Sequence, residues 1–148
     1  MTFPENVPLV IKTGVFHVPG TTTITGGNGS HGTVATAGTT GLWIAGTELH
    51  GRKLLTVAET TTAASDVTEG KVYLMEAVNA NGGSSAALET SAAFTPVALK
   101  RFVNELDLDA VDPTKFYALG ISYKASSGSN NTGTGYVLGF LLDPTYPA

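Results

Sequence analysis

The chain lacks cysteine and is poor in charge. None of its 148 residues is cysteine, which excludes disulfides, thiolate zinc sites and cysteine nucleophiles. Asp, Glu, Lys and Arg make up 14% of the sequence, against about 25% in an average soluble domain. The eight Lys and Arg residues are scattered and are outnumbered by twelve Asp and Glu, which gives a net charge of −4. Because binding to a phosphate backbone requires clustered cations, we expect no nucleic-acid partner.

Long hydrophobic runs are also missing. No segment approaches the roughly 18 unbroken apolar residues of a membrane span, so we expect no membrane partner. The N-terminal stretch MTFPENVPLVIK has no basic region before its short apolar run and does not match a signal peptide. With so few charges, the surface must be covered largely by Thr, Ser, Asn and Gly. This composition favours a protein that meets other protein surfaces over a metabolic enzyme.

The apolar residues that are present fall in short runs between turn residues. The main runs are GLWIAG, GRKLLTVAE, KVYLMEAVN, KFYALGISYKA and GYVLGFLLDP. KVYLMEAVN, residues 71–79, has apolar side chains on both alternating faces, so we expect a central strand there. The sequence predicts one all-β domain over residues 1–148, an antiparallel, jelly-roll-like sandwich or barrel of eight to ten short strands joined by long Gly/Thr/Ser loops. A parallel α/β fold is excluded because no segment is long enough for its crossover helices.

The stretch GGNGSHG places Gly27, Gly29 and Gly32 in the G-x-G-x-x-G spacing of a dinucleotide-binding turn. That turn must open a helix whose N-terminal amides hold the pyrophosphate. The residues that follow, TVATAGTTG, are β-branched and interrupted by glycine, so no such helix is expected. We interpret the stretch as an exposed loop without a cofactor, and we expect replacement of His31 to leave stability nearly unchanged.

Three histidines and three aspartates are the candidate metal ligands: His17, His31 and His50, and Asp107, Asp109 and Asp112. No H-x-H or H-x-x-x-H pair brings two histidines together, so we interpret them as unrelated surface residues. The aspartates depart from the calcium-loop spacing, since the third acid comes one position late and no glutamate closes the loop. We predict no metal site, although the spacing leaves open whether the aspartates hold a structural ion.

Catalytic patterns are equally scarce. The chain has no G-x-S-x-G elbow of a serine hydrolase. Glu76 is the most unusual acid because it lies in the middle of the apolar run VYLMEAV; we interpret it as an outward-facing residue or as a buried partner of Arg101 or Lys53. We therefore expect no catalytic residue and no enzymatic activity.

Prolines and aromatic residues near the ends favour contact with a partner. Residues 1–8 and 143–148 predict extended arms, because proline fixes an extended backbone before binding. Trp43, flanked closely by glycines, is either a core residue or an anchor on a partner surface. The interface candidates are Phe3, Pro4, Pro8, Trp43 and Tyr146.

Two features of the chain carry a resemblance to a known family. They are the terminal arms and the short sheet-forming runs between Gly/Ser/Asn turns, above all GKVYLMEAVN, KFYALGISYK and GYVLGFLLDP. It resembles the jelly-roll cement or decoration proteins of podovirus-type phage heads. The resemblance implies a virion protein on the capsid exterior, made in the host cytoplasm, that binds the major capsid protein and itself as a homodimer or homotrimer. It would bind across capsid subunits and stabilise the expanded head. The alternative is a carbohydrate- or receptor-binding β-sandwich of a tail tip or adhesin, which would use loop residues and exposed aromatics.

Overall fold

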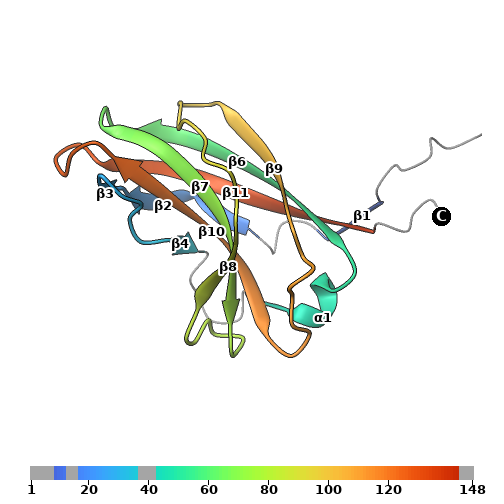
Figure 1. Cartoon of the computed structure of the whole chain (residues 1–148). Coiled ribbons are helices and arrows are strands. Elements are labelled where there is room, and N and C mark those ends of the chain that lie inside the picture. Colours follow the sequence, from blue (N-terminus) through green and yellow to red (C-terminus); the bar gives the residue numbers. More distant parts are fainter. Residues whose placement is uncertain (1–8, 13–16, 37–42, 144–148) are drawn as a thin grey trace, which may run out of the picture.

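Two β-sheets packed face to face make up most of the computed structural model, which describes residues 9–12, 17–36 and 43–143 (Figure 1). Sheet A contains β1 (Leu9–Lys12), β2 (His17–Thr25), β6 (Lys53–Ala63), β9 (Arg101–Leu106) and β11 (Thr132–Asp143). Sheet B contains β3 (Gly27–Asn28), β4 (Ala35–Thr36), β5 (Ile44–Ala45), β7 (Val67–Ala77), β8 (Ala86–Thr90) and β10 (Phe116–Ala125). One short helix, α1 (Gly46–Leu49), precedes β6. No helix in the described part of the chain is long and apolar enough to cross a membrane.

The strands pair in a nested order. In sheet A, β1 and β2 both pair with β11, which pairs with β6, and β6 pairs with β9. In sheet B, β3, β4 and β5 all pair with β10, which pairs with β7, and β7 pairs with β8. The strands thus pair from the two ends of the chain inward: β1 and β2 with β11, β3 to β5 with β10, β6 with β9, and β7 with β8. This nested order is the arrangement of a jelly roll. The predicted all-β sandwich is confirmed, and β7 is a central strand as the sequence indicates.

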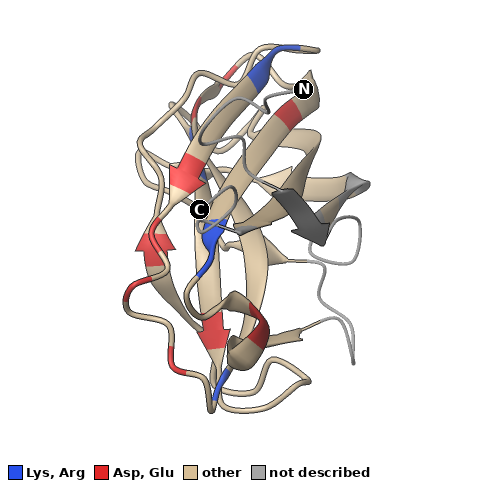
Figure 2. Cartoon of the chain, turned by 90° about the vertical axis from the view of Figure 1, so that its right-hand side faces the viewer, with Lys and Arg blue, Asp and Glu red and all other residues tan. Residues whose placement is uncertain are grey.

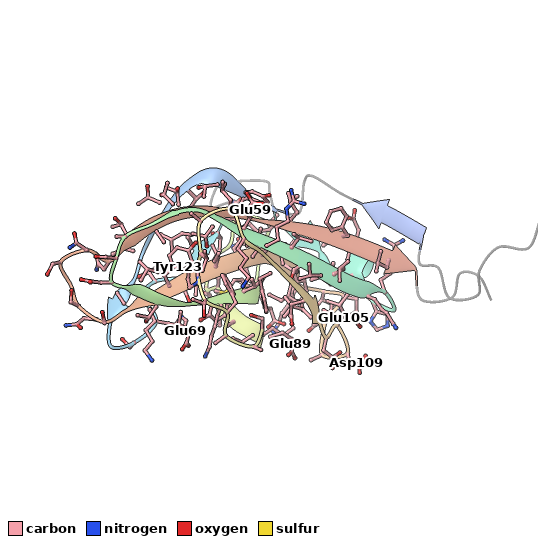
Figure 3. The ribbon with its side chains drawn as sticks, turned by 90° about the horizontal axis from the view of Figure 1, so that it is seen from above. Glu59, Glu69, Glu89, Glu105, Asp109 and Tyr123 are labelled. Atoms are coloured by element: carbon pink, nitrogen blue, oxygen red, sulfur yellow. The ribbon has the colours of Figure 1, made fainter. Side chains whose placement is uncertain are left out.

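The main core lies between the two sheets and is centred on Tyr123 of β10, which Figure 3 shows between the layers. Its ring is fully buried, and its hydroxyl forms a 2.8 Å hydrogen bond with the hydroxyl of Thr60 on β6. Burial raises the pKa of Tyr123. Two glycines of β11 leave room for the ring, because a Cβ would lie 2.7 Å from its Cε2 at Gly133 and 2.8 Å from its hydroxyl at Gly135.

A second apolar cluster covers the outer face of sheet B. Tyr73 and Met75 of β7 point away from the main core and pack with Trp43, and Val34 lies against the same cluster. The strands β3, β4 and β5 pair with β10 within sheet B, and the side chains of Trp43 and Val34 beside them cover part of the outer face of β7 and β10. This cover explains why both strands carry apolar residues on both faces.

The fit between β11 and Tyr123 is testable. Gly133→Ala places a methyl group against the Tyr123 ring and the Thr62 carbonyl, so we expect it to lower the free energy of unfolding by about 1–3 kcal/mol. The matched control is Gly128→Ala, where a Cβ meets nothing within 4 Å, and it should change stability by less than about 0.5 kcal/mol. Urea denaturation measures both. Equal stability of the two variants would contradict the packing described here.

Candidate functional site

Sheet A carries large apolar side chains on its outer face, the face turned away from sheet B. On β11 the outward positions 136, 138, 140 and 142 are Tyr, Leu, Phe and Leu, whereas the inward positions 133, 135, 137, 139 and 141 are Gly, Gly, Val, Gly and Leu. Leu138 and Phe140 pair with Val57 and Leu55 of β6, and all four side chains are half-buried. Val103 of β9 lies opposite Val57 and is 58% exposed. We call these five residues the apolar face.

This distribution differs from the usual one. An antiparallel sheet normally turns its apolar side chains inward and its polar side chains outward. Here the inward side of β11 has three glycines beside the buried Val137 and Leu141, and four large apolar residues lie outside. An apolar patch on the outside of a sheet is typical of a surface that contacts another molecule.

A charged group borders one end of the apolar face. Arg101 donates a 2.9 Å hydrogen bond from Nε to Oε2 of Glu59, and the Tyr136 hydroxyl donates to the same oxygen at 3.0 Å. The bond from Arg101, followed by that from Tyr136, lowers the pKa of Glu59. Figure 3 shows Glu59 on the side of the sandwich opposite Glu69 and Glu89. The arrangement leaves the Arg101 side chain 70% exposed, although it is paired.

On the other sheet, His31 is held by a network of side chains. Its Nε2 lies 2.8 Å from Oε1 of Glu69, and its Nδ1 lies 2.8 Å from the Ser122 hydroxyl, which is also 2.8 Å from the Tyr73 hydroxyl. A carboxylate only accepts hydrogen bonds, so Nε2 carries a proton and donates to Glu69. In the neutral ring Nδ1 then accepts from Ser122, whose oxygen accepts from Tyr73. Both ring nitrogens of His31 and the hydroxyls of Ser122 and Tyr73 therefore have a partner.

The same three residue types form catalytic Ser–His–acid triads. In such a triad the serine must reach a substrate carbonyl. Ser122 is fully buried, and its hydroxyl is already bonded on both sides. We therefore interpret Ser122, His31 and Glu69 as a structural clasp that fastens residues 26–32 to β10.

The interpretation of GGNGSHG as an exposed loop is wrong for most of its length. β3 pairs with the end of β10, the Gly32 N–H donates to the Tyr123 carbonyl at 2.9 Å, and His31 forms a β-bridge with Lys124. A Cβ on Gly32 would overlap the Thr25 carbonyl oxygen. The glycine spacing thus allows backbone to pack on backbone, and only the tip at residues 28–30 is exposed.

Glu76 has partners other than those expected. Lys115 Nζ donates to its Oε1 at 2.5 Å, and the Tyr117 hydroxyl donates to its Oε2 at 2.8 Å. The bond from Lys115 is the main cause that lowers the pKa of Glu76, and burial raises the pKa of Tyr117 to about 12. Glu76 faces Tyr117 across the β7–β10 ladder, so the prediction of Arg101 or Lys53 as its partner is wrong.

The acidic segment after β9 forms turns. The Asp107 carboxylate accepts from the Asp109 N–H at 2.8 Å, and Asp112 accepts from the N–H and hydroxyl of Thr114 at 2.8 and 2.7 Å. An open groove of about 410 Å³ lies beside this segment and is lined by Arg52, Lys53, Glu105, Leu106, Asp107, Leu108 and Asp109. Within the described ranges, no three His, Asp or Glu side chains are grouped closely enough to hold a metal ion.

The interface candidates chosen from the sequence are not brought together. Trp43 is 8% exposed and packs in the outer cluster of sheet B, which agrees with its alternative assignment as a core residue. Phe3, Pro4, Pro8 and Tyr146 lie outside the described residues, as do the arms apart from residue 143, which is the last residue of β11. His50 lies in an exposed turn, and the side chain of His17 is outside the described set.

The apolar face is not among the interface residues predicted from the sequence. Its signal is the alternation of glycine with large apolar residues in TGTGYVLGFLLD.

The clasp predicts that replacement of His31 destabilises the fold, in contrast to the expectation from the sequence that it leaves stability nearly unchanged. His31→Ala leaves the buried Ser122 hydroxyl without one partner, so we expect a loss of about 1–3 kcal/mol in the free energy of unfolding. His50→Ala, in an exposed turn, is the control and should change stability by less than about 0.5 kcal/mol. Urea denaturation at neutral pH decides between the two expectations for His31.

Acid should weaken the fold through its bonded carboxylates. The pKa of Glu76 is lowered first by its bond from Lys115, and that of Glu69 first by its bond from His31. Each such group stabilises the fold in full above the unfolded value of about 4.3, and its contribution is lost as pH falls through the lower folded value. Below about pH 4.5, we expect the urea concentration at the unfolding midpoint to decrease as the pH is lowered. This decrease should be less steep in Glu76→Gln.

The control for this pH series is Glu89→Gln on β8, because the Glu89 carboxylate has no hydrogen bond or ion pair with another described residue. Its midpoints should follow those of the wild-type chain. If Glu76→Gln followed the wild-type curve as well, the assignment of Glu76 as a stabilising carboxylate would be wrong.

In comparisons with known proteins, no family model matches the sequence, and neither a curated protein nor a solved structure matches it significantly.

Proposed function

We propose that this protein is a capsid decoration protein that binds across major capsid subunits of a phage head and stabilises the expanded shell. The observation that carries the proposal is the apolar outer side of β11, which places Leu138 and Phe140 on the outside of sheet A beside Leu55 and Val57. A flat apolar sheet face fits a flat protein surface better than it fits a small ligand, because small-molecule sites are concave.

The scarcity of charge supports the same proposal. Figure 2 shows a ribbon that carries few basic or acidic positions over most of its length. Protein interfaces are depleted of charged residues at their centre, since each unpaired charge removed from water opposes binding. A decoration protein is also repeated many times on one shell, so modest contacts at each copy add up to firm retention.

A carbohydrate- or receptor-binding module remains the second candidate. Jelly rolls also form lectin domains. The observation that favours this alternative is the pair of aromatic side chains on the outer face of β11, Tyr136 and Phe140, next to the polar group of Glu59 and Arg101. Aromatic rings beside hydrogen-bonding groups are typical of sugar sites.

Co-sedimentation with expanded, DNA-free heads of short-tailed phages tests the first proposal. We expect the wild-type chain to sediment with the heads, and Val57→Asp to bind about tenfold more weakly or less, because it buries a charge at the centre of the contact. Ala87→Asp, which adds the same charge at an exposed position of β8, is the matched control and should bind like the wild-type chain.

Absence of wild-type binding to the heads, or equal binding of Val57→Asp and the control, would overturn the decoration proposal. A glycan array probed with the wild-type chain tests the alternative. Saturable binding to a glycan that is lost in Tyr136→Ala would favour the carbohydrate module instead. Trp43 fluorescence is a poor reporter for that experiment, because the indole is buried on sheet B, away from this face.

A further inference from the structure

β9 lies at the edge of sheet A and pairs with β6 on one side only among the described strands. Thr56 of β6 faces Asn104 of β9, and its hydroxyl donates to the Asn104 carbonyl at 3.2 Å. The backbone groups of Asn104 therefore point toward β6. In an antiparallel strand the next residue points its N–H and C=O to the opposite side, so those of Val103 point toward the open edge. An open edge of this kind is a template for another strand.

The side chains along this edge have a symmetric order. The outward positions of β9 are Arg101, Val103 and Glu105, a cation and an anion at equal distances from a central apolar residue. If a second β9 pairs antiparallel about a two-fold axis at Val103, each Arg101 lies opposite Glu105 of the partner subunit. The two valines meet at the centre. Opposite charges and β-branched residues are the favourable cross-strand pairs.

Both charged side chains of this contact, Arg101 and Glu105, can form an ion pair with a second copy. Arg101 uses Nε to bind Glu59, yet its side chain is 70% exposed and a guanidinium has five N–H donors. The Glu105 side chain is exposed and has no hydrogen bond or ion pair with another described residue. A carboxylate beside an arginine with unused donors forms a charge-assisted bond.

Exposed apolar side chains lie on β9 and in the turn that leads into it. Val97, Leu99 and Val103 are 48%, 74% and 58% exposed, and Val78 is the one other large apolar residue so exposed in the described chain. Leu99 also has a positive φ of 63°, a conformation that costs a leucine free energy. The fold thus holds an apolar side chain in water, in a strained conformation, two residues before β9. A partner strand that ends beside Leu99 would shield it.

The corresponding edge of sheet B does not have this complementarity. β8 reads AALET and carries one charged residue, Glu89. A two-fold axis at Glu89 would place two carboxylates opposite each other, and an axis at Leu88 would place Glu89 opposite an alanine. The charge pattern therefore selects β9.

We propose that two copies of this chain associate through β9, in antiparallel register about Val103, and join their two A sheets into one continuous sheet. The partner is a second copy of this chain, and the contact is isologous, with each residue meeting its symmetry mate. This inference goes beyond the proposed function, because it concerns the isolated chain and requires no phage head.

Sedimentation equilibrium of the full chain tests the proposal. We expect the wild-type chain to have twice the mass of one chain, and Glu105→Lys to self-associate about tenfold more weakly or less, because it places like charges opposite each other twice. Glu105→Lys breaks no side-chain hydrogen bond or ion pair with another described residue, so it should remain folded by circular dichroism. Glu89→Lys, the same charge change on β8, is the control and should dimerise like the wild-type chain.

A charge swap makes the register itself testable. Arg101→Glu should also weaken the homodimer, since it places two carboxylates together at each end. In an equimolar mixture of Arg101→Glu and Glu105→Lys, every cross-strand pair has opposite charges, so we expect the mixture to form heterodimers although each variant alone does not.

Three results would overturn the proposal: a monomeric or trimeric wild-type chain, a Glu105→Lys variant that dimerises like the wild-type chain, or a mixture that stays monomeric while both variants are folded. None of these results depends on binding to phage heads. Conversely, a dimer that fails to bind any head would contradict the decoration proposal alone.

Discussion

The burial of β10 on both faces is the constraint on which the rest of the structure depends. One face of this strand contributes Tyr123 to the core between the sheets, and the other contributes Ala118 to the cluster around Trp43. A strand of this kind needs cover on both sides, because either apolar face would otherwise lie in water. Sheet A covers one side. On the other side, Trp43 and Val34 pack against the cluster, and the neighbouring strands β3, β4 and β5 pair with β10. The clasp of His31 with Ser122 adds a side-chain hydrogen bond between this part of the chain and β10.

The same requirement determines the composition of β11. The ring of Tyr123 occupies the space above this strand, so the inward positions Gly133 and Gly135 have no room for a side chain. Four of the large residues of β11 lie on the outside of the sheet, and only Val137 and Leu141 join the core from this strand. Leu138 and Phe140 lie half-buried on the outside of the sheet, not in the core between the sheets. A contact with another molecule, as in the proposed function, would bury them further and would account for their apolar character.

The sequence predicts the fold well and the contacts poorly, for physical reasons. Apolar residues on both alternating faces of KVYLMEAVN require burial on both faces, so its central place follows from local pattern alone. The role of His31 does not, because Glu69 and Ser122 lie 38 and 91 residues away and meet it only after the sheet has formed. The run GYVLGFLLDP predicts a strand but not which face is inside. Alternating glycine and large residues fit either orientation until a neighbour such as Tyr123 fills the space over the glycines.

The apolar face and the β9 edge are adjacent parts of one surface, since Val103 belongs to both. Pairing at β9 would bring two apolar faces into one sheet and double the apolar area that a single partner meets. A face too small to hold one chain on a lattice can then suffice, because the second contact of a linked pair forms at a high effective concentration. The two charge pairs in the contact between the copies add little affinity in water, but they exclude other registers, since a shift by two residues places Val103 opposite a charge. An edge that would otherwise accept any strand is thereby restricted to a second copy of the same chain.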